Sequence, residues 1–153
     1  MLQLEDNMTY EFTVTDFENI AKAGEKGKRA RKKEDVQRAK FLRRVGRKGE
    51  IAFSKIFKNQ IKFGEFISKQ DGCDFILDDN TRIDVKTLDA DYQSKVYIDI
   101  DDYHKSDLFV VMRATETGAS YLGSLKSTEA YKNLKYDKKN DCYFVDLFLF
   151  ESK

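Results

Sequence analysis

Apolar residues recur at steps of three and four along residues 34–58, a spacing that predicts one long amphipathic helix. The apolar stripe consists of Phe41, Leu42, Val45, Gly49, Ala52, Phe53, Ile56 and Phe57. The opposite face carries Arg38, Arg43, Arg44, Arg47, Lys48, Lys55 and Lys58. Gly49 lies inside the apolar stripe, where its missing side chain allows close approach to whatever element the helix packs against.

Short apolar segments on both sides of this helix predict strands, which span residues 9–14, 63–68, 74–77, 81–87, 96–100, 108–112, 120–125 and 143–150. Residues 108–112 are apolar without interruption, as in a strand buried on both faces. Short helices are predicted over residues 16–22, opened by Thr15 and Glu18 as a capping box, and over residues 127–134, capped by Ser127. This order indicates an α/β fold of the α+β kind, with one mixed sheet flanked by helices.

The 153 residues fit one domain, and 41% hydrophobic residues can form a core. We expect residues 34–153 to form that core domain, preceded by a strand, a helix and a basic arm in residues 1–33. No apolar segment is long enough to span a membrane, and the first residues do not resemble a signal peptide. Two cysteines and one histidine exclude a disulfide scaffold and most zinc, haem and histidine-based sites. A reduced, cytoplasmic protein is the expectation.

The net charge of +1 conceals a strong asymmetry along the chain. Residues 22–48 hold 13 basic and 3 acidic residues, a net charge of +10, whereas the rest of the chain carries −9. Residues 23–33 have no apolar face, and we expect them to be mobile without a partner. Such a basic segment predicts a polyanionic partner, although it can also be only a solvated surface. A membrane partner is disfavoured because the most basic stretch has nothing apolar to insert.

Candidate chemistry is concentrated in residues 71–87. Asp84 and Lys86 are two positions apart on a predicted strand, so their side chains leave the same face. A tight hairpin would bring Asp74 back close to Asp84. Two neighbouring carboxylates are costly without a cation between them, and their oxygen atoms suit Mg²⁺ or Mn²⁺. Lys86 could then orient the attacking water or neutralise developing charge.

The spacing of an acid and a lysine is a weak signal by itself, since it also occurs at Asp137–Lys139 and Glu151–Lys153. Neither of those pairs has an apolar strand behind it. Taken singly, Asp74 can be a turn former, Asp84 with Lys86 a surface ion pair, and Glu50 a solvated helix residue. The combination of a helical glutamate, an aspartate and an acid–lysine pair on a strand favours a metal site.

This combination resembles the PD-(D/E)XK nuclease superfamily, over roughly residues 47–112. The resemblance implies a restriction-endonuclease-like core with Glu50, Asp74, Asp84 and Lys86 as catalytic residues. It also implies Mg²⁺ or Mn²⁺ held by Asp74, Asp84 and the Val85 carbonyl, with Glu50 completing the site, and products that carry a 5′-phosphate. One departure is Cys73, which stands where the motif has a proline.

The expected function is therefore Mg²⁺-dependent hydrolysis of DNA, restriction-like or directed to junctions and branches, with no organic cofactor. The candidate DNA contacts are Lys28, Arg29, Arg31, Lys32, Lys33, Arg43, Arg44 and Arg47. Tyr92 and Gln93 follow the site and could contact substrate. A nuclease this small seldom reaches both strands alone, so we expect a homodimer. Two other functions remain open: non-catalytic nucleic-acid binding on the same fold, and RNA cleavage by a toxin or effector nuclease.

Overall fold

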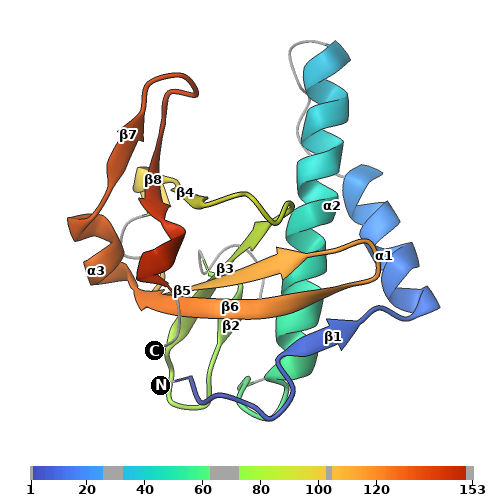
Figure 1. Cartoon of the computed structure of the whole chain (residues 1–153). Coiled ribbons are helices and arrows are strands. Elements are labelled where there is room, and N and C mark those ends of the chain that lie inside the picture. The colour runs from blue at the N-terminus through green and yellow to red at the C-terminus, as the bar shows by residue number, and fades with distance from the viewer. Residues whose placement is uncertain (1, 26–32, 63–72, 103–104, 151–153) are drawn as a thin grey trace.

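The computed structural model describes residues 2–25, 33–62, 73–102 and 105–150, which form a mixed α/β fold around a curled mixed sheet (Figure 1). The predicted strand at 63–68, the basic segment 26–32 and His104 lie outside these residues. The α-helices are α1 (Val14–Glu25), α2 (Lys33–Ile56) and α3 (Ser127–Lys132). The strands are β1 (Thr9–Glu11), β2 (Phe75–Ile76), β3 (Arg82–Leu88), β4 (Lys95–Ile98), β5 (Leu108–Ala114), β6 (Gly118–Lys126), β7 (Lys135–Asp137) and β8 (Cys142–Asp146).

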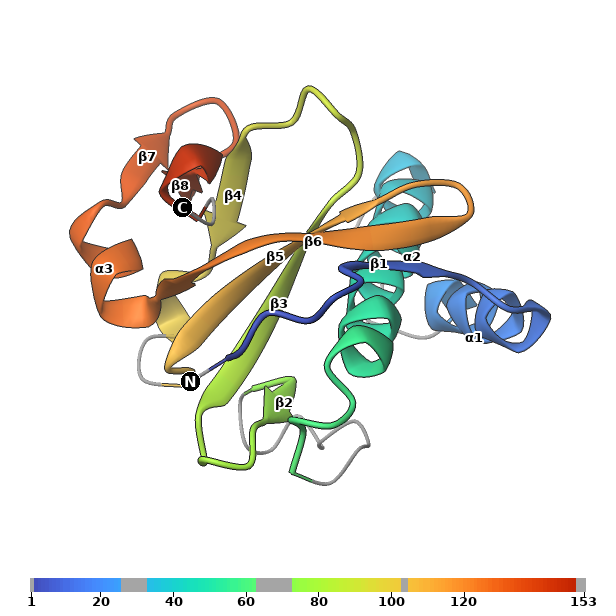
Figure 2. The ribbon, with the colours of Figure 1, turned by 60° about the horizontal axis from the view of Figure 1, so that its bottom comes forward.

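The larger sheet has the strand order β1-β6-β5-β3-β2 (Figure 2). Neighbouring strands run antiparallel except β3 and β5, which run parallel with Ile83 opposite Leu108. The segment between β3 and β5 includes β4, which joins a second sheet of order β4-β8-β7. The prediction of a single sheet is therefore wrong for the described residues, because the chain leaves the first sheet after β3 and returns to it at β5.

Helix α2 covers one face of the larger sheet, and α1 packs on the outer side of α2 (Figure 2). The C-terminal part of the predicted apolar stripe enters the core, since Ala52 and Phe53 of α2, and Phe57 just beyond its end, are fully buried, whereas Leu42 nearer the N-terminus of the helix is 50% exposed. The three buried residues pack against Ile83 and Val85 of β3. None of the helices in the described part of the chain combines the length and the apolar composition needed to cross a membrane.

The smaller sheet and α3 cover the opposite face of the larger sheet, where Phe109 and Val111 of β5 pack with Val96 and Val145. Strand β5 is thus buried on both faces, as its uninterrupted apolar sequence predicts. The fold has three layers, and β3 lies in the middle one. Residues on opposite faces of β3 consequently meet different surroundings.

Several predicted ends of elements are wrong. Helix α1 begins two residues earlier than expected, because Thr13 and Asp16, rather than Thr15 and Glu18, form its reciprocal cap. It also continues to Glu25 and so includes the first part of the segment expected to be mobile.

The C-terminal region also differs from its prediction. Ser127 does not cap α3, where Lys126 is the capping residue without a side-chain bond. The predicted strand at 143–150 ends at Asp146 and is followed by a short 3-10 helix over Leu147–Leu149. Strand β7 was not predicted, because Lys135–Asp137 has a polar sequence and gains its extended form only by pairing with β8.

Gly49 is the point of closest approach between α2 and β3. A methyl group added at Gly49 would lie 1.8 Å from Oγ1 of Thr87 and 2.9 Å from its Cβ atom. Only glycine fits there without moving either element. The glycine thus sets the distance between the helix that carries Glu50 and the strand that carries Asp84 and Lys86.

We expect Gly49→Ala to lower the free energy of unfolding by about 1–3 kcal/mol, because the added methyl group overpacks the contact with Thr87. Gly46→Ala is the matched control, since a methyl group there meets nothing within 4 Å. The control should stabilise the helix by about 0.5–1 kcal/mol, as alanine favours helical backbone over glycine. Denaturant unfolding of both variants measures this, and equal effects at the two positions would contradict the packing argument.

Candidate active site

The turn between β2 and β3 brings Asp74 back beside Asp84. Asn80 adopts a positive φ of 69°, a left-handed conformation that asparagine tolerates well. The Asn80 N–H donates to the Leu77 carbonyl at 2.8 Å, and the Leu77 N–H donates to the Thr81 carbonyl at 2.9 Å. This short closed turn fixes the register of the hairpin and with it the position of Asp74.

Asp74 is anchored to the edge of β3 by two hydrogen bonds. Its backbone N–H donates to the Ile83 carbonyl at 2.9 Å, and its Oδ2 accepts from the Val85 N–H at 2.8 Å. The carboxyl group therefore occupies the edge of β3 just beyond the short pairing with β2. Cys73, at the position of the motif proline, is buried, as expected of a packing residue.

Asp84 and Lys86 leave the same face of β3, as the strand period predicts. The Lys86 Nζ lies 3.1 Å from Oδ2 of Asp84, and the two side chains are 23% and 16% exposed. Ile83 and Val85 point to the opposite face and are buried beneath α2. The acid and the lysine are thus paired in a half-buried position with their backbone fixed by the sheet.

Glu50 reaches this edge of the sheet from α2. Its Oε2 lies 3.3 Å from Nη1 of Arg47, one turn earlier in the same helix, and its side chain is 26% exposed. The carboxylate is close enough to Asp74 to raise the pKa of that group. Glu50 is expected to complete a metal site, and in the structure it forms an ion pair with Arg47.

The surroundings of Asp74 disfavour its ionised form. Burial is the largest cause of the raised pKa of Asp74, which reaches about 8, and the neighbouring charges of Asp84 and Glu50 add to it. A hydrogen bond between the carboxyl groups of Asp74 and Asp84 acts in the same direction, whereas the Val85 N–H favours the ionised form. The cluster of Glu50, Asp74 and Asp84 therefore holds a proton at neutral pH unless a cation compensates its charge.

The chemistry of these donors fits a hard divalent cation. In the described residues, no group of three or more His, Cys, Asp or Glu side chains is placed to hold a metal ion. Mg²⁺ needs fewer protein ligands than that, since it retains several waters and binds through one or two carboxylates and substrate phosphates. Asp74 and Asp84 offer such a pair of carboxyl groups, and burial together with the charges of Asp84 and Glu50 raises the pKa of Asp74.

The arginines of α2 that were predicted to contact DNA have partners within the chain. Arg43 donates to the Gly24 carbonyl at 3.0 Å, and Arg47 donates to Oδ1 of Asn19 at 3.1 Å. Arg44 also packs over Gly24. These contacts connect α2 to α1, so part of the basic pattern serves helix packing. Lys28, Arg29, Arg31 and Lys32, together with the side chain of Lys33, lie outside the described residues.

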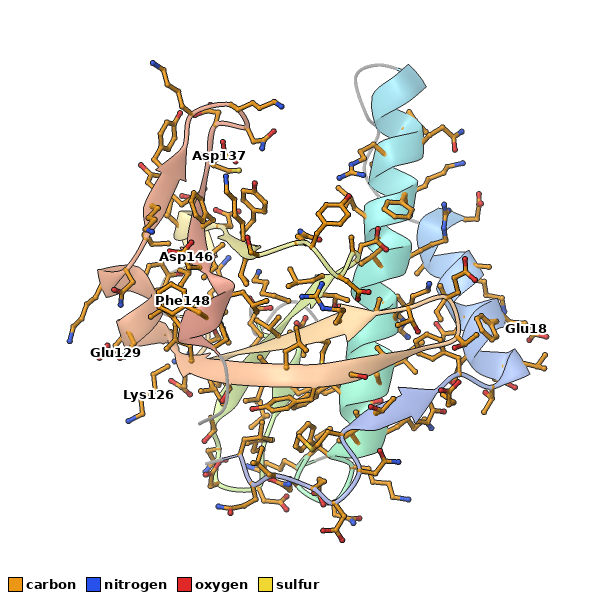
Figure 3. The ribbon with its side chains drawn as sticks, viewed as in Figure 1. Glu18, Lys126, Glu129, Asp137, Asp146 and Phe148 are labelled. Atoms are coloured by element: carbon orange, nitrogen blue, oxygen red, sulfur yellow. The ribbon has the colours of Figure 1, made fainter. Side chains whose placement is uncertain are left out.

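A cleft of about 780 Å³ opens beside the cluster, on the face of β3 that carries Lys86. Its walls come from the N-terminal half of α2, the loop between β3 and β4, strand β4 and the β7–β8 hairpin, which stands opposite α2 (Figure 1). Figure 3 shows Asp137 in this hairpin. Tyr92 and Gln93 line the cleft beside Lys86. The sequence could not predict that α2, β4 and the β7–β8 hairpin form the other walls, because these segments are far apart along the chain.

No family model matches this chain, and no curated protein matches it in sequence.

Proposed function

We propose that this protein is a divalent-metal-dependent endonuclease that hydrolyses phosphodiester bonds in DNA, with a core of the PD-(D/E)XK type. The observation that carries the proposal is the convergence of four residues from three segments of the chain at one edge of β3. Glu50 comes from α2, Asp74 from the start of the β2 hairpin, and Asp84 with Lys86 from β3. Three carboxyl groups gathered in a half-buried place repel one another and lose hydration, a cost in free energy that ordinary surface charges on a strand pair do not incur.

The roles follow from the position of each group. Asp74 and Asp84, with the Val85 carbonyl, would hold Mg²⁺ or Mn²⁺, and Glu50 would complete or tune the site. When bound, the ion supplies positive charge for the scissile phosphate and lowers the pKa of a water molecule. Lys86, which pairs with Asp84, would donate a hydrogen bond to a phosphate oxygen and stabilise negative charge that develops there.

Cleavage assays with the purified chain test this function directly. Supercoiled plasmid, linear duplex, branched DNA and single-stranded RNA are incubated with Mg²⁺, with Mn²⁺ and with EDTA. We expect cleavage of DNA that requires the divalent ion and leaves 5′-phosphate ends. Preferential cleavage of RNA would move the proposal to a ribonuclease, and salt-dependent DNA binding without any cleavage would leave a binding protein on the same fold.

We expect Lys86→Ala to reduce the cleavage rate about 100-fold or more, because the transition state loses a positioned cation. Lys132→Ala is the matched control, since Lys132 also pairs with a carboxylate, Glu129, but does so on α3. The control should cut at the rate of the wild type. Single-turnover rates at saturating Mg²⁺ make the comparison, and a Lys86→Ala enzyme of unchanged rate would remove this residue from the chemistry.

A further inference from the structure

Tyr92 presents its ring to solvent from a firmly built loop. The side chain is 91% exposed, yet Arg113 donates from its guanidinium to the carbonyls of Ala90 and Gln93. Within the loop, the Gln93 N–H donates to the Ala90 carbonyl at 3.0 Å, and the Asp89 N–H donates to the Gln93 side chain at 3.2 Å. These bonds hold the backbone of the loop, so binding through the large aromatic ring would order little additional backbone.

The cleft wall formed by α2 is also apolar and partly uncovered. Phe41, Leu42 and Val45 line it, and Leu42 is 50% exposed. These residues continue the apolar stripe of α2 beyond the part that Phe53 and Phe57 bury in the core. Tyr97 of β4 adds a further ring to the cleft. The cleft thus offers apolar and aromatic surface from several directions.

Cations are distributed among these apolar groups. Arg38, Lys86 and Lys95 line the cleft, and among the lining residues in the described part of the chain Asp89 is the one with an acidic side chain. The Arg38 guanidinium lies 5.6 Å from the centre of the Phe41 ring, and Lys95 lies 3.8 Å from the Asp137 carboxylate. The side-chain amides of Gln93 and Asn140 supply donors and acceptors in the same space. The lining therefore suits a ligand that combines negative charge with flat, polar-edged rings.

We propose that this cleft binds an unpaired segment of the DNA strand that is to be cut, with a base stacked on Tyr92. Single strands are bound by cationic grooves with aromatic side chains, because unpaired bases expose the ring faces that a duplex keeps stacked. Lys86 belongs both to the cleft and to the acidic cluster, so a strand in the cleft leads directly to the site. The inference rests on the proposed nuclease function and specifies its substrate as DNA in which a strand leaves the duplex beside the cut.

Fluorescence anisotropy in EDTA measures the binding step without cleavage. The probes are a blunt DNA duplex and the same duplex with a single-stranded oligothymidine tail. We expect Tyr92→Ala to weaken binding of the tailed duplex about 5- to 100-fold, which corresponds to the loss of one stacked base. Binding of the blunt duplex should change by less than about twofold, since backbone contacts by other cations remain. Tyr92→Phe keeps the ring and should retain the affinity of the wild type.

Tyr136→Ala is the matched control, because Tyr136 is another exposed tyrosine, on β7, and does not line the cleft. It should bind both probes as the wild type does. Equal losses for both probes in Tyr92→Ala, or no loss for the tailed probe, would overturn the inference. So would a tailed probe that binds no better than the blunt duplex, as expected if the cleft instead accepts a peptide.

Cleavage of the same two probes in Mg²⁺ separates this inference from the proposed function. If the wild type cuts DNA and Tyr92→Ala changes neither the binding nor the cleavage of either probe, the nuclease proposal is supported and the proposed binding of an unpaired strand is refuted. If Tyr92 supports binding of the tail but neither probe is cut, the cleft assignment stands and the nuclease proposal fails. Tyr92 is exposed, so its replacement should leave the unfolding midpoint unchanged.

Discussion

Replacing Asp84 with asparagine is expected to reduce Mg²⁺-dependent DNA cleavage about 1,000-fold or more, while DNA binding stays equal or becomes tighter. The substitution keeps the shape of the side chain but removes the charge that pairs with Lys86 at 3.1 Å and adjoins Asp74. Cleavage is lost because a carboxylate proposed to hold the metal ion is lost. Binding is preserved because one negative charge fewer faces the phosphate backbone.

Single-turnover cleavage and anisotropy binding on one DNA substrate measure the two effects together. The matched control is Glu129→Gln, which removes a carboxylate from the ion pair with Lys132 on α3, away from the site (Figure 3). It should affect neither quantity. An Asp84→Asn protein that is folded by circular dichroism and still cuts at the rate of the wild type would refute the metal-site assignment.

Asp74→Asn is expected to stabilise the protein at neutral and alkaline pH in the presence of EDTA. The pKa of Asp74 is raised from 3.8 to about 8, so the folded protein binds a proton there that the unfolded chain releases. Below about pH 4 Asp74 is protonated in both the folded and the unfolded state and does not lower the free energy of unfolding. As the pH rises towards about 8, the unfolded chain releases this proton while the folded protein keeps it, and the free energy of unfolding of the wild type falls. Asparagine carries no such proton, and its side-chain oxygen can still accept from the Val85 N–H.

The difference in unfolding free energy between Asp74→Asn and the wild type should therefore grow with pH. Its slope can reach about 1.4 kcal/mol per pH unit between about pH 4 and about pH 8, the value for one proton. Urea unfolding at a series of pH values in EDTA measures it. Saturating Mg²⁺ should reverse the order at neutral pH, because the ion stabilises only a protein that binds it. A pH-independent difference would show that the carboxyl group of Asp74 is ionised throughout.

The two predictions probe different properties of the same acidic cluster. Asp84→Asn tests the proposed cleavage of DNA by the folded protein. Asp74→Asn tests how much the burial of Asp74 beside the other carboxyl groups lowers the free energy of unfolding, and this measurement needs no substrate. A stability effect without a cleavage effect would indicate a strained but non-catalytic group of acids, which corresponds to the binding-protein alternative.

The parts of the site that are close along the chain could be predicted from sequence. A strand turns successive side chains to opposite faces, so Asp84 and Lys86 share a face wherever the strand lies. The hairpin that returns Asp74 to β3 closes within a few residues and is specified by local turn chemistry at Asn80. The apolar stripe likewise identifies residues that enter the core, Phe53 and Phe57 among them, but it does not distinguish them from Leu42, which stays half exposed.

Glu50 illustrates the limit of this reasoning. Its place on a helix follows from periodicity, but its approach to Asp74 depends on how closely α2 packs on β3, which Gly49 and Thr87 set. The role of Arg47 as its partner depends on the rotamers within the helix. Arg43 shows the same limit, since a basic residue on a helix face cannot reveal by spacing that it bonds to the Gly24 carbonyl of α1.

By itself, the sequence determined the mixed helix and strand composition, the long amphipathic helix, and the shared face of Asp84 and Lys86, because backbone geometry repeats over a few residues. Only the tertiary structure decided that the strands form two sheets and that α2, the Tyr92 loop and the β7–β8 hairpin enclose one cleft beside Lys86. Those features depend on packing between segments far apart in the chain, and side-chain complementarity across such distances leaves no periodic trace in the sequence.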